Sequence, residues 1–184
     1  VMPQTKTAYS LSSPLVFLEQ DIASKGIGLS FDNLTFRKVR PPVEVQLALQ
    51  LTADLPSQLD QKSIQHLVKP TAYLQKKLLR MDGAAGALDI TYILLELGQQ
   101  LGKQLKQQMT FPTLEDSGIP IEKIDATIEC THADYETSDY LEVPLGHPLI
   151  VYRYTTYTTG EKPILHGKTI SRADRFCYSL TISR

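Results

Sequence analysis

The residues with the greatest chemical capacity in this sequence, its histidines and cysteines, are spread widely along the chain. They are His66, His132, His147, His166, Cys130 and Cys177. A zinc site needs more ligands at tighter spacing than Cys130, His132 and Cys177 supply. The sequence also shows no Ser-His-Asp spacing, phosphate-binding loop or metal-ligand cluster. It therefore predicts neither catalysis nor a metal or other cofactor.

The two cysteines lie in strand-like segments, where free buried thiols of a reducing compartment are the simplest interpretation. No apolar run approaches the ~20 residues needed to span a bilayer. The N-terminus lacks the basic, apolar and small-residue succession of a signal peptide. We therefore expect a cytoplasmic protein with no membrane partner.

The balance of charge argues against a chain that binds nucleic acid unaided. The 19 Lys and Arg residues are scattered and nearly balanced by 20 Asp and Glu, which gives a formal net charge of -1. Binding to phosphates needs a concentrated basic surface. A length of 184 residues fits one domain with a substantial core.

The central part of the sequence predicts a strand hairpin followed by a helix. Ala72 to Met81 has the composition of a buried strand, Asp82-Gly83 is a turn, and a return strand passes through Leu88 to Ile93. A leucine stripe at helical spacing follows, with apolar residues on one side only. Its members are Leu94, Leu97, Leu101 and Leu105.

The last third predicts mainly strands. Ile124 to Cys130 alternates between apolar and polar residues, as in a half-exposed strand, and a short helix is predicted over Asp134 to Leu141. Three further strands joined by short turns are predicted as antiparallel neighbours. They are Leu149–Thr158, Ile164–Ser171 and Phe176–Ile182. With about six strands, mostly consecutive, the chain is expected to be an α+β domain on an antiparallel sheet.

The first third is predicted to hold an arm, two helices and one strand. Residues 1–13 are polar and irregular. A helix is expected from Leu15 to Lys25 with Gly26 as its stop, and a strand from Leu29 to Arg37 with a break at Asp32-Asn33. A short helix over Val43–Leu51 and a loop over Thr52–Lys69 complete this part.

Several segments together carry a resemblance to a known family. They are Leu141–Ile150, Tyr157–Ile164, Arg172-Ala173-Asp174-Arg175-Phe176, Lys77 through Asp82-Gly83, and Asp89-Ile90-Thr91-Tyr92. Each is a loose pattern, but in this order they resemble the UTRA domain. That domain is the small-molecule-sensing module of HutC-type regulators in the bacterial GntR family.

The resemblance implies a chorismate-lyase-like fold, with an antiparallel six-stranded sheet and flanking helices. It also implies a homodimer and a pocket for a small-molecule effector. Full-length members carry an N-terminal winged helix-turn-helix, which this sequence does not contain. We therefore expect residues 1–13 to be a linker or arm and residues 14–184 to be the effector-binding and dimerisation domain. DNA would be bound only through the N-terminal domain that is absent from this chain.

Candidate effector-binding residues follow from the family's positions. Two arginines on the central strand of sugar-phosphate sensors correspond here to Lys77 and Leu79. Arg80 is one place out of register, and a shift of one residue in a strand moves a side chain to the opposite face. The family's acidic residue on the return strand corresponds to Asp89. Its hydroxyl near the next helix and its tyrosine before the Arg-x-Asp-Arg run correspond to Thr110 and Ser171; for these two hydroxyls an end-capping role is the alternative.

Three further candidates come from other elements. Glu19 lies on the opening helix, where relatives often have small hydroxyl residues. Arg153 lies on a strand whose other face carries Tyr152 and Tyr154, so this sheet could line a pocket or a dimer interface. Arg175 is the arginine of the Arg-x-Asp-Arg turn more suited to a ligand, although such a turn can also serve structure alone.

The residues at these positions favour one class of effector. Without an arginine pair, bidentate recognition of phosphate is lost, and Lys77 alone is less specific. Glu19 near a helix N-terminus would repel an anion. We therefore expect a carboxylate, an amino-acid-like compound or a partly apolar metabolite rather than a sugar phosphate. A chorismate-lyase-like enzyme and a dimerisation module without a functional pocket remain as alternatives.

Overall fold

The core of the protein is a six-stranded sheet in which every neighbouring pair is antiparallel. The computed structural model describes residues 6–10, 28–51 and 70–179. In spatial order the strands are β2 (Leu29–Val39), β3 (Ala72–Met81), β4 (Ala84–Leu94), β7 (Lys162–Arg172), β6 (Pro148–Thr158) and β5 (Lys123–His132). The predicted α+β class and antiparallel six-stranded sheet are confirmed.

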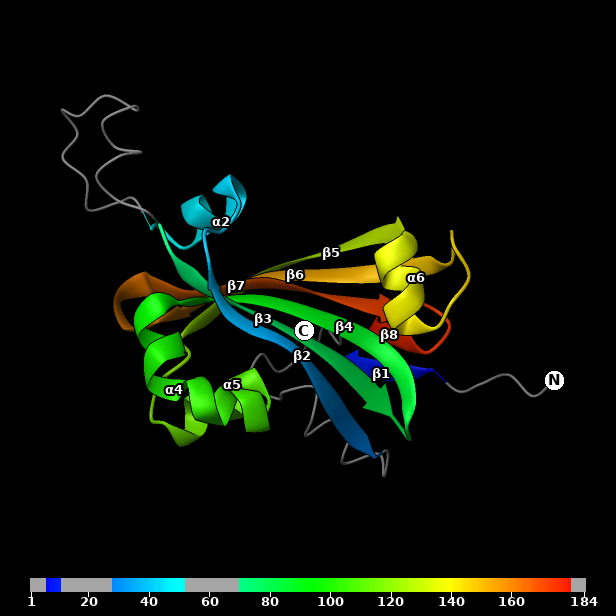
Figure 1. Cartoon of the computed structure of the whole chain (residues 1–184), viewed down its shortest axis with the longest axis horizontal. Helices are drawn as coiled ribbons and strands as arrows, with labels where there is room; N and C mark the ends of the chain where they lie inside the picture. Colours follow the sequence, from blue (N-terminus) through cyan, green and yellow to red (C-terminus); the bar gives the residue numbers. More distant parts are fainter. Residues whose placement is uncertain (1–5, 11–27, 52–69, 180–184) are drawn as a thin grey trace, which may run out of the picture.

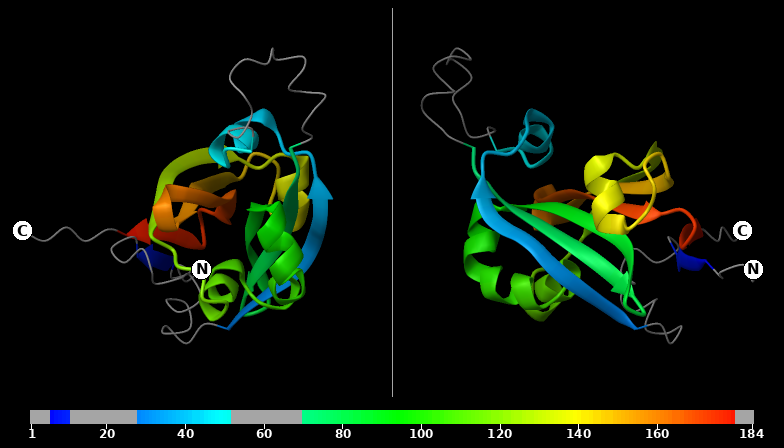
Figure 2. Two further views of the ribbon diagram at one scale, coloured as in Figure 1. Left: turned by 90° about the vertical axis from the view of Figure 1, so that its left-hand side faces the viewer. Right: turned by 45° about the vertical axis from the view of Figure 1, so that its right-hand side comes forward.

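Helices cover both faces of this sheet. Figure 1 shows α4 (Leu95–Gln107) and α5 (Thr110–Asp116) below the sheet, and α2 (Val43–Ala48) and α6 (Tyr135–Leu141) above it. Figure 2 shows the same separation from two other directions. We call these sides the α4 face and the α6 face. A short 3-10 turn, η1 (Thr159–Glu161), joins β6 to β7.

The hairpin of β3 and β4 fixes the register at the centre of the sheet. Its turn residues Asp82 and Gly83 both have positive φ, 48° and 81°, which suits the right-handed twist of the flanking strands. The Asp82 carboxylate also accepts a hydrogen bond from the Gly28 amide at 3.0 Å. The resulting register places Lys77 directly opposite Asp89.

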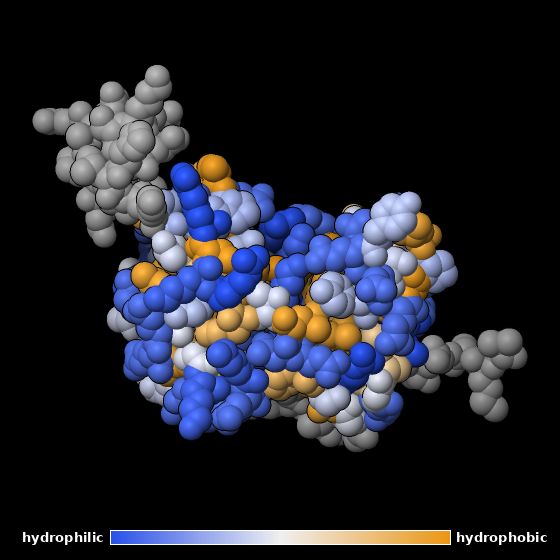
Figure 3. All heavy atoms as spheres, in the orientation of Figure 1, coloured by the Kyte–Doolittle hydropathy of each residue, from blue (hydrophilic) through white to orange (hydrophobic). Residues whose placement is uncertain are grey.

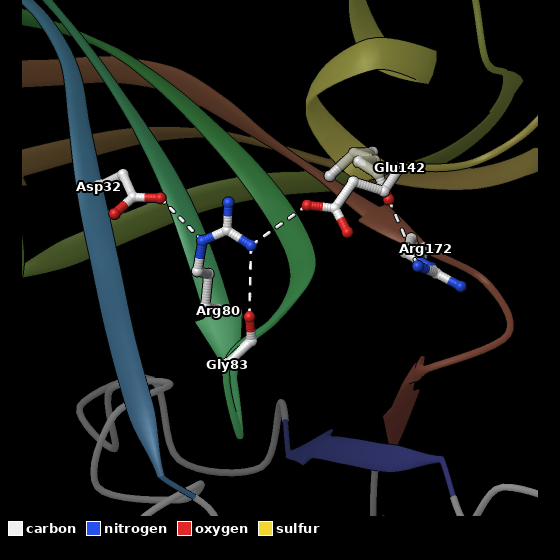
Figure 4. Close-up of polar contacts among 6 residues, drawn as sticks. Asp32, Arg80, Gly83, Glu142 and Arg172 are labelled. Carbon is white, nitrogen blue, oxygen red and sulfur yellow. Dashed lines mark hydrogen bonds and ion pairs between the residues drawn. The ribbon is translucent and has the colours of Figure 1, made fainter.

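Arg80 links three elements on the α6 face (Figure 4). Its guanidinium donates to Asp32 of β2 at 2.8 Å, and to the Gly83 carbonyl and Glu142 at 3.3 Å each. Glu142 directly follows α6, so this network ties the helix to the hairpin. The prediction that Arg80 points away from the face of Leu79 is confirmed, since Leu79 is buried among apolar residues on the other side.

Separate apolar clusters lie on the two faces. On the α4 face, leucines of α4 pack against the central strands; the buried members include Leu101, Leu105, Ile93 and Leu165. On the α6 face, Leu141 packs with residues of β3, β4, β6 and β7. Because hydrophobic residues of β3 and β4 are buried on both faces, these strands read as nearly continuous apolar runs.

The C-terminal strand departs from the expected meander. β8 (Phe176–Ser179) pairs in parallel with β1 (Thr7–Ser10), and the two form a separate sheet. β7 already has β4 on one edge and β6 on the other, so no edge is left for a third strand of a meander. The expectation of an irregular arm is therefore wrong for Thr7–Ser10, which form a strand.

Burial also differs from expectation along β5. This strand was expected to be half-exposed, but nearly all of its residues are exposed, including Ile128 at 46%. It lies at the end of the sheet, and within the described part of the chain β6 is its one partner strand. Cys130 on this strand is exposed and Cys177 is half-buried, so the expectation of buried thiols is wrong. The predicted helix at 15–25 and loop at 52–69 fall outside the described residues.

Candidate functional site

A buried lysine lies at the centre of the α4 face. Lys77 has an exposed fraction of 0%, and its ammonium lies 4.4 Å from the ring centroid of Phe31 on β2. The same ammonium donates a hydrogen bond to the backbone carbonyl of Gln108, just after α4. A charged amine buried in this way needs compensation, and the Gln108 carbonyl and the Phe31 ring supply part of it.

The carboxylate opposite Lys77 is held by hydroxyl groups. Asp89 is 9% exposed and accepts hydrogen bonds from Thr91 at 2.7 Å, Thr169 at 2.8 Å and Tyr154 at 3.4 Å. Burial raises the pKa of Asp89, while the three hydroxyls and the positive charge of Lys77 act in the opposite direction. Burial, reinforced by the nearby Asp89 charge, raises the pKa of Tyr154 well above its ordinary value.

A second polar chain positions α5 beside this pair. The Thr110 hydroxyl donates to the Gln75 side-chain carbonyl at 2.7 Å, and the Gln75 amide donates to the Leu105 carbonyl at 2.7 Å. Gln75 and Lys77 are two residues apart on β3, so both side chains point to the α4 face. The start of α5 and the end of α4 are thereby fixed against the centre of the sheet.

The structure brings four of the candidate residues to one face. Lys77, Asp89, Thr110 and Ser171 are all buried on the α4 face, across β3, β4, α5 and β7. Leu79, at the second arginine position of the family, is 1% exposed in an apolar cluster.

The turn that contains Arg175 combines a structural pair with an unsatisfied donor. Arg172 and Asp174 form a two-bonded ion pair at 2.8 and 3.1 Å, and His147 lies 3.3 Å from the same carboxylate. Hydrogen bonding to Arg172 lowers the pKa of Asp174 to about 2. Arg175, in contrast, has a buried Nε with no hydrogen-bond acceptor in the described part of the chain. Glu19 lies outside the described residues.

Arg153 lies on the opposite side of the sheet from Lys77. It is directly opposite Lys168 on β7 and 3.5 Å from Glu129, whereas the next residue, Tyr154, points to Asp89. The structure therefore does not place Arg153 with the other candidates. Alternation along β6 separates it from the tyrosine face, as the sequence predicted.

Sequence reasoning missed three polar residues of this cluster, Gln75, Thr91 and Thr169, and named Tyr154 only as part of a face that could line a pocket or a dimer interface. Each is two residues from a candidate or lies on the same face of a neighbouring strand. Polar residues at inward positions of an otherwise apolar strand were the signal that could have identified Gln75 and Thr91. Tyr154 and Thr169 become visible only with the strand order, because they reach Asp89 from β6 and β7.

The cluster offers a cation, a carboxylate, several hydroxyls and aromatic rings within one buried area. Such convergent polar groups on a mostly apolar background are typical of small-molecule sites. Within residues 6–10, 28–51 and 70–179, no group of three or more His, Cys, Asp or Glu is placed to hold a metal ion. Among the helices that are described, none is long and apolar enough to cross a membrane.

Solved structures share this fold. PhnF from Mycobacterium smegmatis is 13% identical, with a TM-score of 0.80 over 98% of this chain and 73% of that one. The ligand-binding domain of a GntR-family transcriptional regulator from Bordetella bronchiseptica is 19% identical, with a TM-score of 0.70 over 85% and 90% of the two chains. The fold is thus that of GntR-family effector domains.

Sequence comparison identifies the family. The model of the UTRA domain matches residues 71–177, so the chain belongs to the UTRA domain family. The HTH-type transcriptional repressor NagR of Bacillus subtilis (strain 168) is 26% identical over 93 residues, which are 50% of this chain and 38% of that repressor. The match thus spans well under half of the relative. These proteins are regulators, and they give no support to the chorismate-lyase-like alternative.

Proposed function

We propose that this chain is the effector-binding and dimerisation domain of a bacterial DNA-binding transcriptional regulator of the GntR family, HutC type. A small metabolite binds on the α4 face, at Lys77, Asp89, Thr110 and Ser171. The observation that carries this proposal is the convergence of these four residues in one buried area. They were selected from the sequence by family position alone, yet they come from four different elements.

The charges of the cluster support the proposed class of effector. Lys77 is already opposed by Asp89, and neither Lys77 nor Leu79 supplies a guanidinium. A lysine binds phosphate less specifically than a pair of arginines does. An amino-acid-like compound presents both charges that Lys77 and Asp89 complement, and the ring of Phe31 suits a partly apolar body. Arg175, whose Nε has no acceptor among the described residues, remains a candidate donor for a carboxylate.

Regulation would follow from a shift between two arrangements of the dimer. A metabolite that binds one arrangement better shifts the population toward it and alters the spacing of the attached DNA-binding domains. Because paired half-sites are read through dimer geometry, such a shift changes operator affinity. The regulator would act in the cytoplasm, with DNA contacted through its DNA-binding domains.

The exposed edge strand supports the homodimer. All ten residues of β5 lie at the end of the sheet, and Ile128 on it is 46% exposed. A long edge strand with unpaired backbone groups favours pairing with another chain. Sedimentation equilibrium of this chain is expected to give twice the monomer mass, and replacing Ile128 with Lys is expected to weaken association. A purely monomeric chain would contradict this part of the proposal.

The effector itself is sought by thermal unfolding against a panel of metabolites. The panel holds amino acids and their breakdown products, dicarboxylates, sugar phosphates, phosphonates and fatty acids. Ligand at a hundred times its dissociation constant adds about 2.7 kcal/mol, which raises the midpoint by roughly 5 to 10 °C for a domain of this size.

Two variants then locate the site. The effector's shift is expected to disappear in Thr110→Val, which removes a hydroxyl of the cluster, and to persist in Lys103→Gln on the exposed side of α4. A response only to sugar phosphates would contradict the effector class. A flat panel with an intact dimer would favour a dimerisation module without a functional pocket.

A further inference from the structure

A second hollow lies on the α6 face, on the opposite side of the sheet from the proposed effector site. It has a volume of about 240 Å³. Its floor is formed by side chains of β3, β4, β7 and β6, and α2 forms one wall. In Figure 3 the surface between α2 and α6 is mostly hydrophilic. Its charged floor residues are Lys76, Lys168 and Arg153, with His166 beside them.

The strand register places these cations in a single row. Lys76 is opposite Ile90, Ile90 is opposite Lys168, and Lys168 is opposite Arg153. Three cations thus follow one line across four adjacent strands. Like charges directly opposite each other on neighbouring strands destabilise a sheet. The pairing of Lys168 with Arg153 is therefore a local cost to the fold that an anion between them would offset.

The carboxylates that pair with this row of cations are exposed to solvent. Lys76 is paired with Glu136 and Arg153 with Glu129, but these partners are 54% and 50% exposed. Such exposed pairs contribute little energy and are easily exchanged. The charge of Lys168 lowers the pKa of Asp134, and Glu44 of α2 is the one carboxylate among the described residues that line the hollow.

His166 reports the same electrostatic field. Burial lowers its pKa first, and the charge of Arg153 lowers it further, while Glu44 acts the other way. Its Nδ1 is 2.9 Å from the Thr155 hydroxyl, which fixes the ring at the edge of the row.

From this row and the hollow above it, we propose a second ligand site that binds a small multivalent anion, with phosphate or several carboxylate groups. Arg153 and Lys168 contact the anion from the floor and Lys76 from the side. The hollow accommodates a compact molecule of few atoms beyond its charged groups. The proposed effector site lies on the other face of the sheet.

The two sites share three strands, so we expect binding at one site to affect binding at the other. Lys76 and Lys77 are consecutive on β3, Ile90 follows Asp89 on β4, and Lys168 precedes Thr169 on β7. Consecutive residues point to opposite faces of a sheet. An anion that draws Lys168 toward Arg153 acts on the strand segment that positions Thr169 against Asp89, so the second ligand is expected to change affinity at the first site.

The test is calorimetric titration of the chain with inorganic phosphate, pyrophosphate and citrate at low ionic strength. At least one probe is expected to bind saturably, and Lys168→Gln and Arg153→Gln are expected to weaken it by about tenfold or more, since each removes a charged hydrogen bond. Lys103→Gln, the matched loss of one positive charge on α4, is expected to leave binding within about twofold, because this exposed side chain lies on the other face of the sheet and forms no hydrogen bond with the anion.

A second readout locates the bound anion without depending on variants. An anion over Lys168 is expected to raise the pKa of His166, measured by NMR titration of its ring, because added negative charge favours the imidazolium. No saturable binding of any probe would overturn the proposal. Equal losses in Lys168→Gln and Lys103→Gln, or binding that leaves His166 unchanged, would do so as well. None of these outcomes depends on whether the α4 face binds an effector.

Discussion

Replacing Lys77 with Met is expected to destabilise the fold strongly, because it removes a buried positive charge that lies opposite the buried Asp89 in the strand register and favours its ionised form. Met retains a flexible unbranched chain that can pack on Phe31. It supplies no charge to Asp89, which is 9% exposed and would keep only its three hydroxyl donors. Removing one partner of a buried pair typically costs about 3–5 kcal/mol.

The neighbouring lysine provides the matched control. Lys76 is also on β3, but it points to the α6 face and pairs with the exposed Glu136. Lys76→Met removes the same charge from the same strand, and a pair of this kind contributes about 1 kcal/mol or less. Urea unfolding of both variants at pH 7 measures the two free energies of unfolding. The difference between them isolates the effect of burial from the effect of losing a lysine.

The pH dependence gives a further condition. Burial raises the folded-state pKa of Asp89 above 3.8, so the folded state binds a proton more readily, and stability is lost as pH rises through the folded pKa. Without Lys77 this pKa rises further. The loss in free energy of unfolding caused by Lys77→Met is therefore expected to be largest near neutral pH and to become smaller as pH falls toward 3.8. Equal losses in the two lysine variants, or a deficit independent of pH, would refute the reasoning.

Two other predictions concern packing and a turn. In Gly98→Ala the new Cβ would lie 2.2 Å from a Tyr73 ring carbon. The variant is expected to be less stable than the parent, because the cost of overpacking, about 1–3 kcal/mol, exceeds the ~1 kcal/mol gain in helix propensity. Gly102→Ala, whose nearest contact is 3.1 Å, is expected to be at least as stable as the parent in urea unfolding; the reverse order would be inconsistent with this packing. In Arg172→Gln, the pKa of Asp174, measured by NMR, is expected to rise from about 2 toward 3.8. In the parent chain the ionised Asp174 stabilises the fold above pH 3.8, and this stabilisation is lost as pH falls toward 2; the variant is expected to have less of it. An Asp174 titration that stays near 2 would show that Arg172 is not the cause.

Local patterns predicted much of the fold correctly. The β3 strand was predicted with its observed bounds, because an apolar run bounded by Asp82-Gly83 specifies both a strand and its turn. The helix predicted at 134–141 is observed as α6, and Asp134 forms a capping box with Thr137. These elements depend on interactions a few residues apart, which the sequence displays directly.

Features that depend on strand order were not accessible in this way. β8 was expected beside β7, but occupancy of both β7 edges is a property of the whole sheet. Likewise, the alternation along β5 suggested one buried face, although its Ile128 is 46% exposed. At the candidate site, family position identified Lys77 and Asp89, whereas Tyr154 required knowledge that β6 lies two strands away from β4.

The parallel pairing of β1 with β8 has a mechanical consequence. Thr7 is aligned with Phe176 and Ser10 with Ser179, so the two strands run in the same direction along their whole length. Tension applied to the chain at Thr7 along the strand axis, against the anchored body of the domain, loads these rungs together in shear rather than one after another. β1 therefore resists sliding, and Phe176, which is fixed in the core with Leu79 and Ala87, becomes the point where that load enters the sheet.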